Sequence, residues 1–160
     1  MVKKFYVLVI TIFTFGSLYS QSTFIQKIWA WEIANVGGAS IDPSMGIEQT
    51  QNIYHLVYLE TKSFNKIENI TVWCKNGFVY SAKTQKITSF PLKFNGSEVL
   101  IKKPKNQLLE CVLNKIDVLL TPKKIKNLFE KNEMVIEYTV NKKVYFTTLK
   151  TVPKMKQELM

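Results

Sequence analysis

Arginine is absent from the 160-residue chain, so all 22 of its basic residues are lysine. Arginine is the planar, bidentate donor that proteins favour for guanine edges, carboxylates and transferring phosphoryl groups. The lysines are interspersed with acids along the chain, as on a solvated surface. The net charge of +10 is therefore weak support for a nucleic-acid partner, and we expect none. A working electrostatic patch is the alternative interpretation.

Histidine and cysteine are also scarce, with one histidine and two cysteines. The chain contains no CxxC pair, no zinc-ligand cluster, no glycine-rich phosphate loop and no nucleophile elbow. Asp42 and Glu48 lie in the segment 36–51, but two acids are too few for a calcium loop, which needs six or more oxygen ligands. His55 has no partner at an obvious spacing, which favours a hydrogen-bonded structural role over a catalytic base. We therefore expect no cofactor, no metal and no catalytic residue.

No apolar run reaches the length of about 20 residues that a membrane-spanning helix needs. The N-terminus instead matches a signal peptide: Lys3 and Lys4 precede an apolar stretch at 5–15, and small residues follow at 16–20. This pattern predicts cleavage between Ser20 and Gln21. We expect an exported protein, periplasmic or extracellular, with no integral membrane span once residues 1–20 are removed.

Export allows the two cysteines to form a disulfide. Alternation along 67–74 and 109–113 places Cys74 and Cys111 on the apolar faces of their strands. A disulfide between them is the first hypothesis, and it would stabilise the fold by about 3–4 kcal/mol on the chain-entropy model. Two unpaired buried thiols are the alternative.

Apolar residues alternate with period two along most of the chain, which indicates strands. Asn76-Gly77 is a hairpin signal between the strands at 67–74 and 78–82, and Asn141 begins a second turn. Thr121 and Pro122 begin the one expected helix, a short connection that ends near Lys131. The other expected strands are 27–35, 53–61, 86–94, 99–102, 108–113, 116–120, 134–140 and 144–150.

These elements predict an all-β fold, with one domain at 24–151 and a mobile C-terminal tail at 152–160. Short strands and hairpins in an exported chain favour a single antiparallel β-sandwich with immunoglobulin-like packing and one short connecting helix. The pattern of Gly37-Gly38, the strand 53–61, the segment 70–77 and the hairpin 136–146 resembles a group of small exported Bacteroidetes proteins. That resemblance covers most of the chain after residue 20, and it implies packing rather than an activity.

Large aromatic residues are frequent and could stack on sugars or grip a peptide. Trp29 and Trp31 alternate with Ile33, which favours a core position for both tryptophans. Trp73 is different because Ile70, Val72 and Cys74 occupy the apolar face of its strand. We therefore expect Trp73 on the opposite face with Asn69 and Thr71, where these three residues form the candidate binding surface.

Two function classes follow from these observations. The first is a non-catalytic exported binding or envelope-accessory module whose partner is a protein or glycan of the cell envelope. The alternative is a small extracytoplasmic hydrolase that uses Asp42, Glu48 or His55, which would have to meet in one pocket. The sequence does not predict an oligomeric state.

Overall fold

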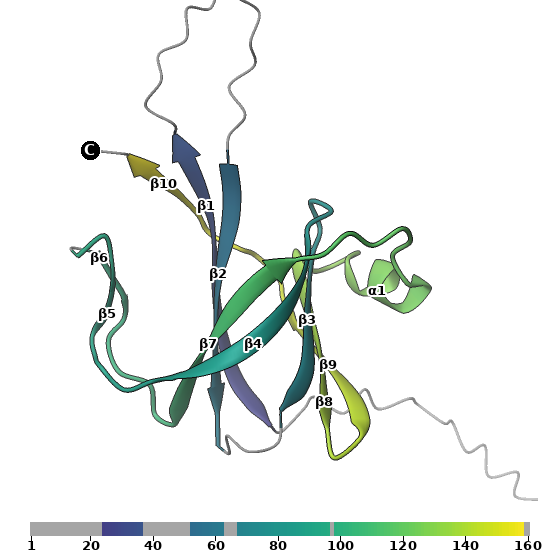
Figure 1. Cartoon of the computed structure of the whole chain (residues 1–160), viewed down its shortest axis with the longest axis horizontal. Helices are drawn as coiled ribbons and strands as arrows, with labels where there is room; N and C mark the ends of the chain where they lie inside the picture. The colour runs from purple at the N-terminus through teal and green to yellow at the C-terminus, as the bar shows by residue number, and fades with distance from the viewer. Residues whose placement is uncertain (1–23, 37–51, 63–66, 97, 159–160) are drawn as a thin grey trace, which may run out of the picture.

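The computed structural model describes residues 24–36, 52–62, 67–96 and 98–158 of the chain (Figure 1). Strands dominate these residues, and the only helix among them is the six-residue α1. The elements in chain order are β1 Ile25–Val36, β2 Asn52–Thr61, β3 Glu68–Cys74, β4 Val79–Ile87, β5 Leu92–Phe94, β6 Glu98–Ile101, β7 Gln107–Lys115, α1 Lys123–Leu128, β8 Met134–Val140, β9 Lys143–Leu149 and β10 Lys154–Glu158.

Eight of the strands form one curled sheet in the order β10-β1-β2-β7-β4-β3-β8-β9, and β5 and β6 form a separate hairpin. All pairs are antiparallel except β1 with β10, which is parallel. The all-β class is confirmed, but the sandwich packing is not. The sheet curls until its two sides approach each other, and the rings of Phe24 and Tyr145 meet edge to face at 5.4 Å between centroids (Figure 1). A twisted sheet of long strands can thus cover its own concave face.

The main core lies on this concave face, where six strands contribute inward residues. Alternation decides which residues these are: Ile70, Val72 and Cys74 of β3 point inward, as the sequence predicted. The buried members of the cluster are Ile25, Ala30, Val57, Leu59, Ile70, Val72, Cys74, Tyr80, Leu109, Cys111, Met134, Ile136, Tyr138, Val140 and Val152.

Two smaller clusters cover parts of the convex face. In the first, α1 places Ile125 against Trp73, Val79 and Val135. In the second, the β5–β6 hairpin and Phe90, which precedes it, bring apolar residues onto β1, β2 and β7, where Trp29 and Trp31 are half-buried. The core position expected for Trp29 and Trp31 is therefore met only in part, because both are half-buried in this smaller cluster and neither belongs to the main core.

The prediction that the Trp73 indole belongs to an exposed binding surface is wrong. Trp73 does lie on the face opposite Val72, but only 7% of its surface is exposed because α1 covers it. Its Nε1–H donates to Glu137 Oε2 at 3.2 Å. Strand alternation predicts the face of a residue, but it carries no information on which later segment packs over that face.

The expected disulfide is also wrong, because Cys74 and Cys111 are both free thiols buried in the main core. Cys74 N–H donates to the carbonyl of Phe78 just before β4, whereas Cys111 of β7 pairs with Thr84 in the middle of β4. Six residues of extended chain separate these two positions, about 20 Å. A disulfide needs Cα atoms within about 7 Å of each other.

Both expected hairpin turns form, with different backbone geometries. Gly77 N–H donates to the carbonyl of Cys74 at 3.0 Å, and Gly77 has φ of +92°, so a glycine in the left-handed region closes a three-residue loop. Asn141 and Lys142 both have positive φ, at 50° and 65°, as a two-residue type I′ turn requires.

Two further expectations need correction. Residues 116–120 are an exposed connection rather than a strand, because β7 ends at Lys115. Residues 152–158, which the sequence places in a tail, instead bury Val152 and add β10 to the sheet beside β1. Among the described residues no helix is both long and apolar enough to cross a bilayer.

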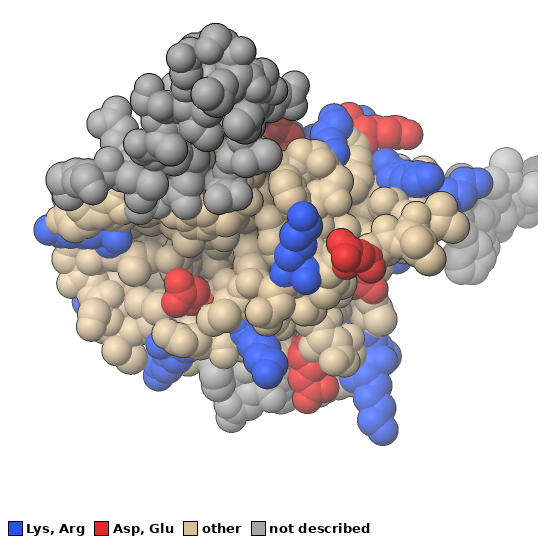
Figure 2. Space-filling view, turned by 45° about the horizontal axis from the view of Figure 1, so that its top comes forward, with Lys and Arg blue, Asp and Glu red and all other residues tan. Residues whose placement is uncertain are grey.

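The lysines do not gather on the face shown in Figure 2, where basic and acidic side chains are interspersed. This distribution agrees with the solvated surface that the sequence predicts.

Candidate functional site

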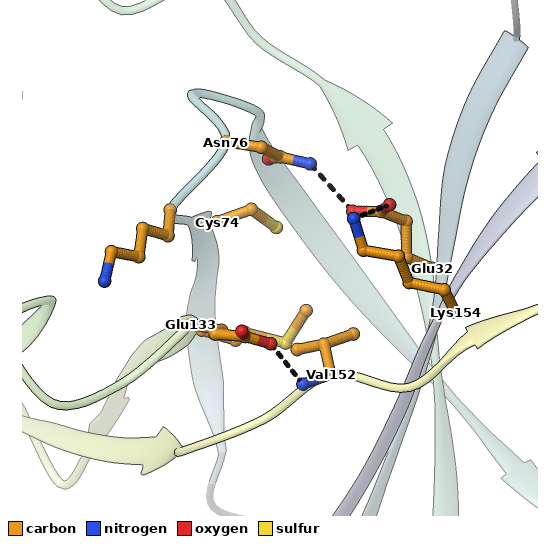
Figure 3. A pocket seen from close by; sticks show the side chains of 8 residues that line it. Glu32, Cys74, Asn76, Glu133, Val152 and Lys154 are labelled. Carbon is orange, nitrogen blue, oxygen red and sulfur yellow. Dashed lines mark hydrogen bonds and ion pairs between the residues drawn. The ribbon is translucent and has the colours of Figure 1, made fainter.

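A pocket of about 280 Å³ opens at one end of the curled sheet, where β1 and β10 face β3 and the start of β8. Its floor is apolar and contains Cys74, Met134 and Val152. Its other lining residues are polar: Glu32, Lys75, Asn76, Glu133 and Lys154 (Figure 3). The strands that form the two sides are far apart in sheet order, so the curl of the sheet creates the pocket.

Glu32 is the carboxylate that points into this space from β1. Its side chain is only 15% exposed. Asn76 Nδ2 donates to Glu32 Oε2 at 3.0 Å, and Lys154 Nζ lies 3.3 Å from Glu32 Oε1. The backbone N–H of Glu32 donates to the carbonyl of Pro153 at 2.9 Å, which fixes β10 beside the carboxylate. A turn and a C-terminal strand therefore meet at one side chain.

His55 lies behind Glu32, because the two residues are direct partners in the β1–β2 register. Its Nε2 is 3.6 Å from Glu32 Oε2, and its Nδ1 is 2.9 Å from the hydroxyl of Tyr80. Burial is the main cause that lowers the pKa of His55, opposed by the charge of Glu32 and a hydrogen bond to it. Burial also raises the pKa of Tyr80 to about 12, with smaller contributions from Cys74 and Glu32.

The contacts assign the imidazole tautomer. The Glu32 carboxylate can only accept a hydrogen bond, so the His55 nitrogen that faces it, Nε2, carries the proton, and Nδ1 accepts from the Tyr80 hydroxyl. Both ring nitrogens are thereby directed at protein groups. The ring of His55 also packs edge to face on Phe78 and Tyr80, with centroid distances of 5.9 and 5.5 Å.

The opposite wall of the pocket is formed by β3 and the start of β8, and Glu133 just before β8 ties it to Val152, which precedes β10. Burial, and secondarily the charge of Glu32, raises the pKa of Cys74 to about 12, so this residue is a thiol at neutral pH. Glu133 Oε2 accepts a hydrogen bond from the backbone N–H of Val152 at 2.6 Å. Lys75 N–H donates to the carbonyl of Glu133 at 2.8 Å, which ties the hairpin turn to this wall.

The structure separates the residues that the sequence singled out. Of the predicted binding surface, Trp73 is buried under α1, while Asn69 is exposed at a register shift between β3 and β8. Thr71 pairs with Ser81 and Glu137 in the middle of the sheet. None of these three lines the pocket.

The other predicted residues fall into two groups. Ser20, Gln21, Asp42 and Glu48 lie outside the described residues, so the predicted cleavage site and the acidic pair of the hydrolase hypothesis stay predictions. His55 is described, and it reaches the pocket through Glu32. In the described part of the chain, no group of three histidine, cysteine or acidic side chains could hold a metal ion.

Sequence reasoning missed Glu32, Asn76, Glu133 and Lys154. On β1, Glu32 lies on the face opposite Trp29 and Trp31, and this face is the concave one. One signal was present: a lone acid and a lone histidine each interrupt an apolar strand. Such residues indicate a buried pair when their strands are neighbours, because a buried polar side chain needs a partner.

Comparison of the chain with known proteins shows no relationship: no family model matches it, and neither a curated protein nor a solved structure is significantly similar.

Proposed function

We propose that this chain is an exported, non-catalytic binding module, and that its pocket takes an ammonium group on a short aliphatic stem. A lysine side chain or the amino terminus of a protein partner has this chemistry. The single observation that carries the proposal is the Glu32 carboxylate, which points into an open pocket with sulfur-containing and aliphatic residues at its floor.

Binding requires the ligand ammonium to replace the Lys154 ammonium at the Glu32 carboxylate. Lys154 pairs with Glu32 Oε1, but 80% of the Lys154 side chain is exposed, and an exposed ion pair contributes little free energy. A ligand ammonium that replaces Lys154 keeps the carboxylate paired and places its aliphatic stem in the pocket. Met134 and Val152 are already only 0% and 8% exposed, so the apolar area removed from water is mainly that of the stem itself. The ligand then gains apolar burial that the solvated Lys154 does not provide.

The size of the pocket limits the ligand. Sites for drug-sized molecules enclose about 300–1,000 Å³, and this pocket has about 280 Å³. It fits one side chain or chain end rather than several sugar rings. A neutral glycan also offers no cation to Glu32, so a protein partner is favoured over the glycan that the sequence leaves open.

The protonation states of Cys74 and His55 favour binding over hydrolysis, and of the three residues in the hydrolase alternative His55 alone lies in the described part of the chain. Attack by a thiol requires the thiolate, and the pKa of Cys74 is about 12. A general base needs a free lone pair within reach of the substrate. The lone pair of His55 Nδ1 accepts the Tyr80 proton, and Nε2 faces Glu32.

Export is part of the proposal and rests on the N-terminal pattern around Lys3 and Lys4. Intact-mass analysis of envelope and culture fractions should find a chain that begins at or within a few residues of Gln21. Recovery of the chain from the cytosol with Met1 in place would refute export and leave the pocket proposal standing.

The binding test uses two matched probes, Nα-acetyl-lysine methylamide and its norleucine analogue, which has an aliphatic stem without the ammonium. We expect the lysine probe to shift the backbone amide resonances of Cys74, Asn76 and Met134, with a Kd on the order of 1 mM for so small a ligand. The norleucine probe should bind at least about tenfold more weakly, the equivalent of one charge-assisted contact.

Variants connect the binding to Glu32. Glu32→Gln should reduce affinity for the lysine probe by about tenfold, whereas Glu98→Gln, an exposed acid on β6, should leave it unchanged. Lys154→Gln should strengthen binding, because the competing ammonium is gone. Equal affinity for both probes, or weaker binding by the Lys154 variant, would contradict the proposal.

A further inference from the structure

The connection between β7 and α1 carries the most exposed apolar side chains of the described residues. Leu119 is fully exposed at 101%, and Leu120 is 79% exposed. Val118 and Ile116 are 40% and 36% exposed. A single exposed apolar side chain is ordinary on a protein surface, but contiguous ones mark an interaction site.

Both ends of this connection are fixed to the fold. Ile116 N–H donates to the carbonyl of Val79 at 2.9 Å, which extends the β4–β7 ladder by one bond. At the other end, Ile125 of α1 is 1% exposed and packs against Trp73. Figure 1 shows the chain running outward from the end of β7 before it returns to α1. The fold thus holds the two leucines away from every core.

Lysines flank the leucines on both sides. The segment 115–126 contains four lysines and one acid, Asp117. All four lysines, which are Lys115, Lys123, Lys124 and Lys126, are exposed. Two of them lie over aromatic rings at the base of the connection: Lys115 Nζ is 4.8 Å from the ring centroid of Phe78, and Lys124 Nζ is 3.9 Å from that of Phe146.

We infer that this connection is a membrane-surface contact, in which Leu119 and Leu120 enter the headgroup region of an anionic bilayer and the flanking lysines pair with lipid phosphates. The charged headgroups of a bilayer lie outside its hydrocarbon. A protruding connection with two leucines and flanking lysines fits this order, because the leucines can reach the hydrocarbon boundary while the lysines stay among the headgroups. Lysine suits this position because its aliphatic stem can extend along apolar surface while the ammonium reaches the headgroups.

A lipid surface fits the patch better than a folded partner does. Stable protein interfaces bury about 800 Å² on each side, and four apolar residues on one connection offer much less. A bilayer needs no shape complementarity, and its negative charge complements the net charge of +3 in the segment 115–126. This contact is peripheral and agrees with the absence of a spanning helix among the described residues.

The test is flotation of the chain beginning at Gln21, which keeps every described strand and lacks the apolar N-terminal stretch that would itself bind lipid. The vesicles are phosphatidylcholine alone or phosphatidylcholine with phosphatidylglycerol. We expect binding to the anionic vesicles that is at least about tenfold stronger than to the neutral ones and that weakens as salt screens the lysines.

The variants separate the leucines from general surface hydrophobicity. Leu119→Ser with Leu120→Ser should lower the partition coefficient by at least about tenfold, and the folded state should tolerate the change because both side chains are exposed. Val144→Ser is the matched control, a 54% exposed apolar residue on β9, and should bind as the unmodified chain does. Unchanged vesicle binding by the double-serine variant would overturn the inference. Self-association that the same variant abolishes, without any vesicle binding, would assign the leucines to a second copy and equally overturn it.

Discussion

Replacement of Trp73 by alanine tests how the fold uses the convex face of β3. The indole is 7% exposed between β3, β4, β8 and α1. A tryptophan buries about 200 Å² or more, and at about 25 cal/mol per Å² this corresponds to about 5 kcal/mol of transfer free energy. Alanine recovers part of that area, so Trp73→Ala should lower the free energy of unfolding by about 3–5 kcal/mol.

Urea unfolding followed by circular dichroism measures this loss, with Trp73→Phe as the matched control. Phenylalanine keeps most of the apolar contact with Ile125 and Val135 but loses the Nε1–H donor to Glu137. One part-buried hydrogen bond contributes about 1 kcal/mol, so this variant should lose much less stability than the alanine one. A loss under about 1 kcal/mol for Trp73→Ala would refute the packing argument, because it would mean that the indole is exposed as strand alternation alone suggested.

Two further predictions concern buried groups. Alkylation of the unfolded chain without reductant should label both Cys74 and Cys111, and in the folded chain neither should react rapidly, because burial raises the pKa of both thiols to about 12; protection of both in the unfolded chain would reveal a disulfide. The folded pKa of His55 lies below the unfolded value of 6.5, so its contribution to stability is present above about pH 6.5 and decreases as the pH falls below it. When the pH is lowered from about 7 to about 5.5, the melting temperature should therefore fall less for His55→Gln than for the unmodified chain. An equal fall for both proteins would contradict the neutral, buried His55.

Local features of the fold could be read from the sequence. Alternation placed Ile70, Val72 and Cys74 on the inner face, and the Asn-Gly signal marked the β3–β4 turn. Both depend on neighbours in the chain. The curl of the sheet, the cover of α1 over Trp73 and the addition of β10 depend on contacts between distant segments, which periodicity does not encode.

In the candidate site, too, single residues could be recognised from the sequence but their contacts with distant segments could not. His55 was singled out as a lone histidine, but its partners Glu32 and Tyr80 lie on other strands. The registers of β1 with β2 and β10 bring His55 and Lys154 opposite Glu32, and the curl of the sheet then brings Asn76 to the same carboxylate. No sequence spacing joins these residues, so the pocket could be recognised only from the structure.

A crystal structure of the chain with n-butylammonium shows directly whether the Glu32 carboxylate receives a ligand ammonium. We expect the ammonium nitrogen about 3 Å from Glu32 Oε1, the butyl chain against Met134 and Val152, and the Lys154 side chain displaced into solvent. An intact ion pair between Lys154 and Glu32, with no butylammonium in the pocket at a concentration well above the Kd measured for that probe, would contradict the proposal.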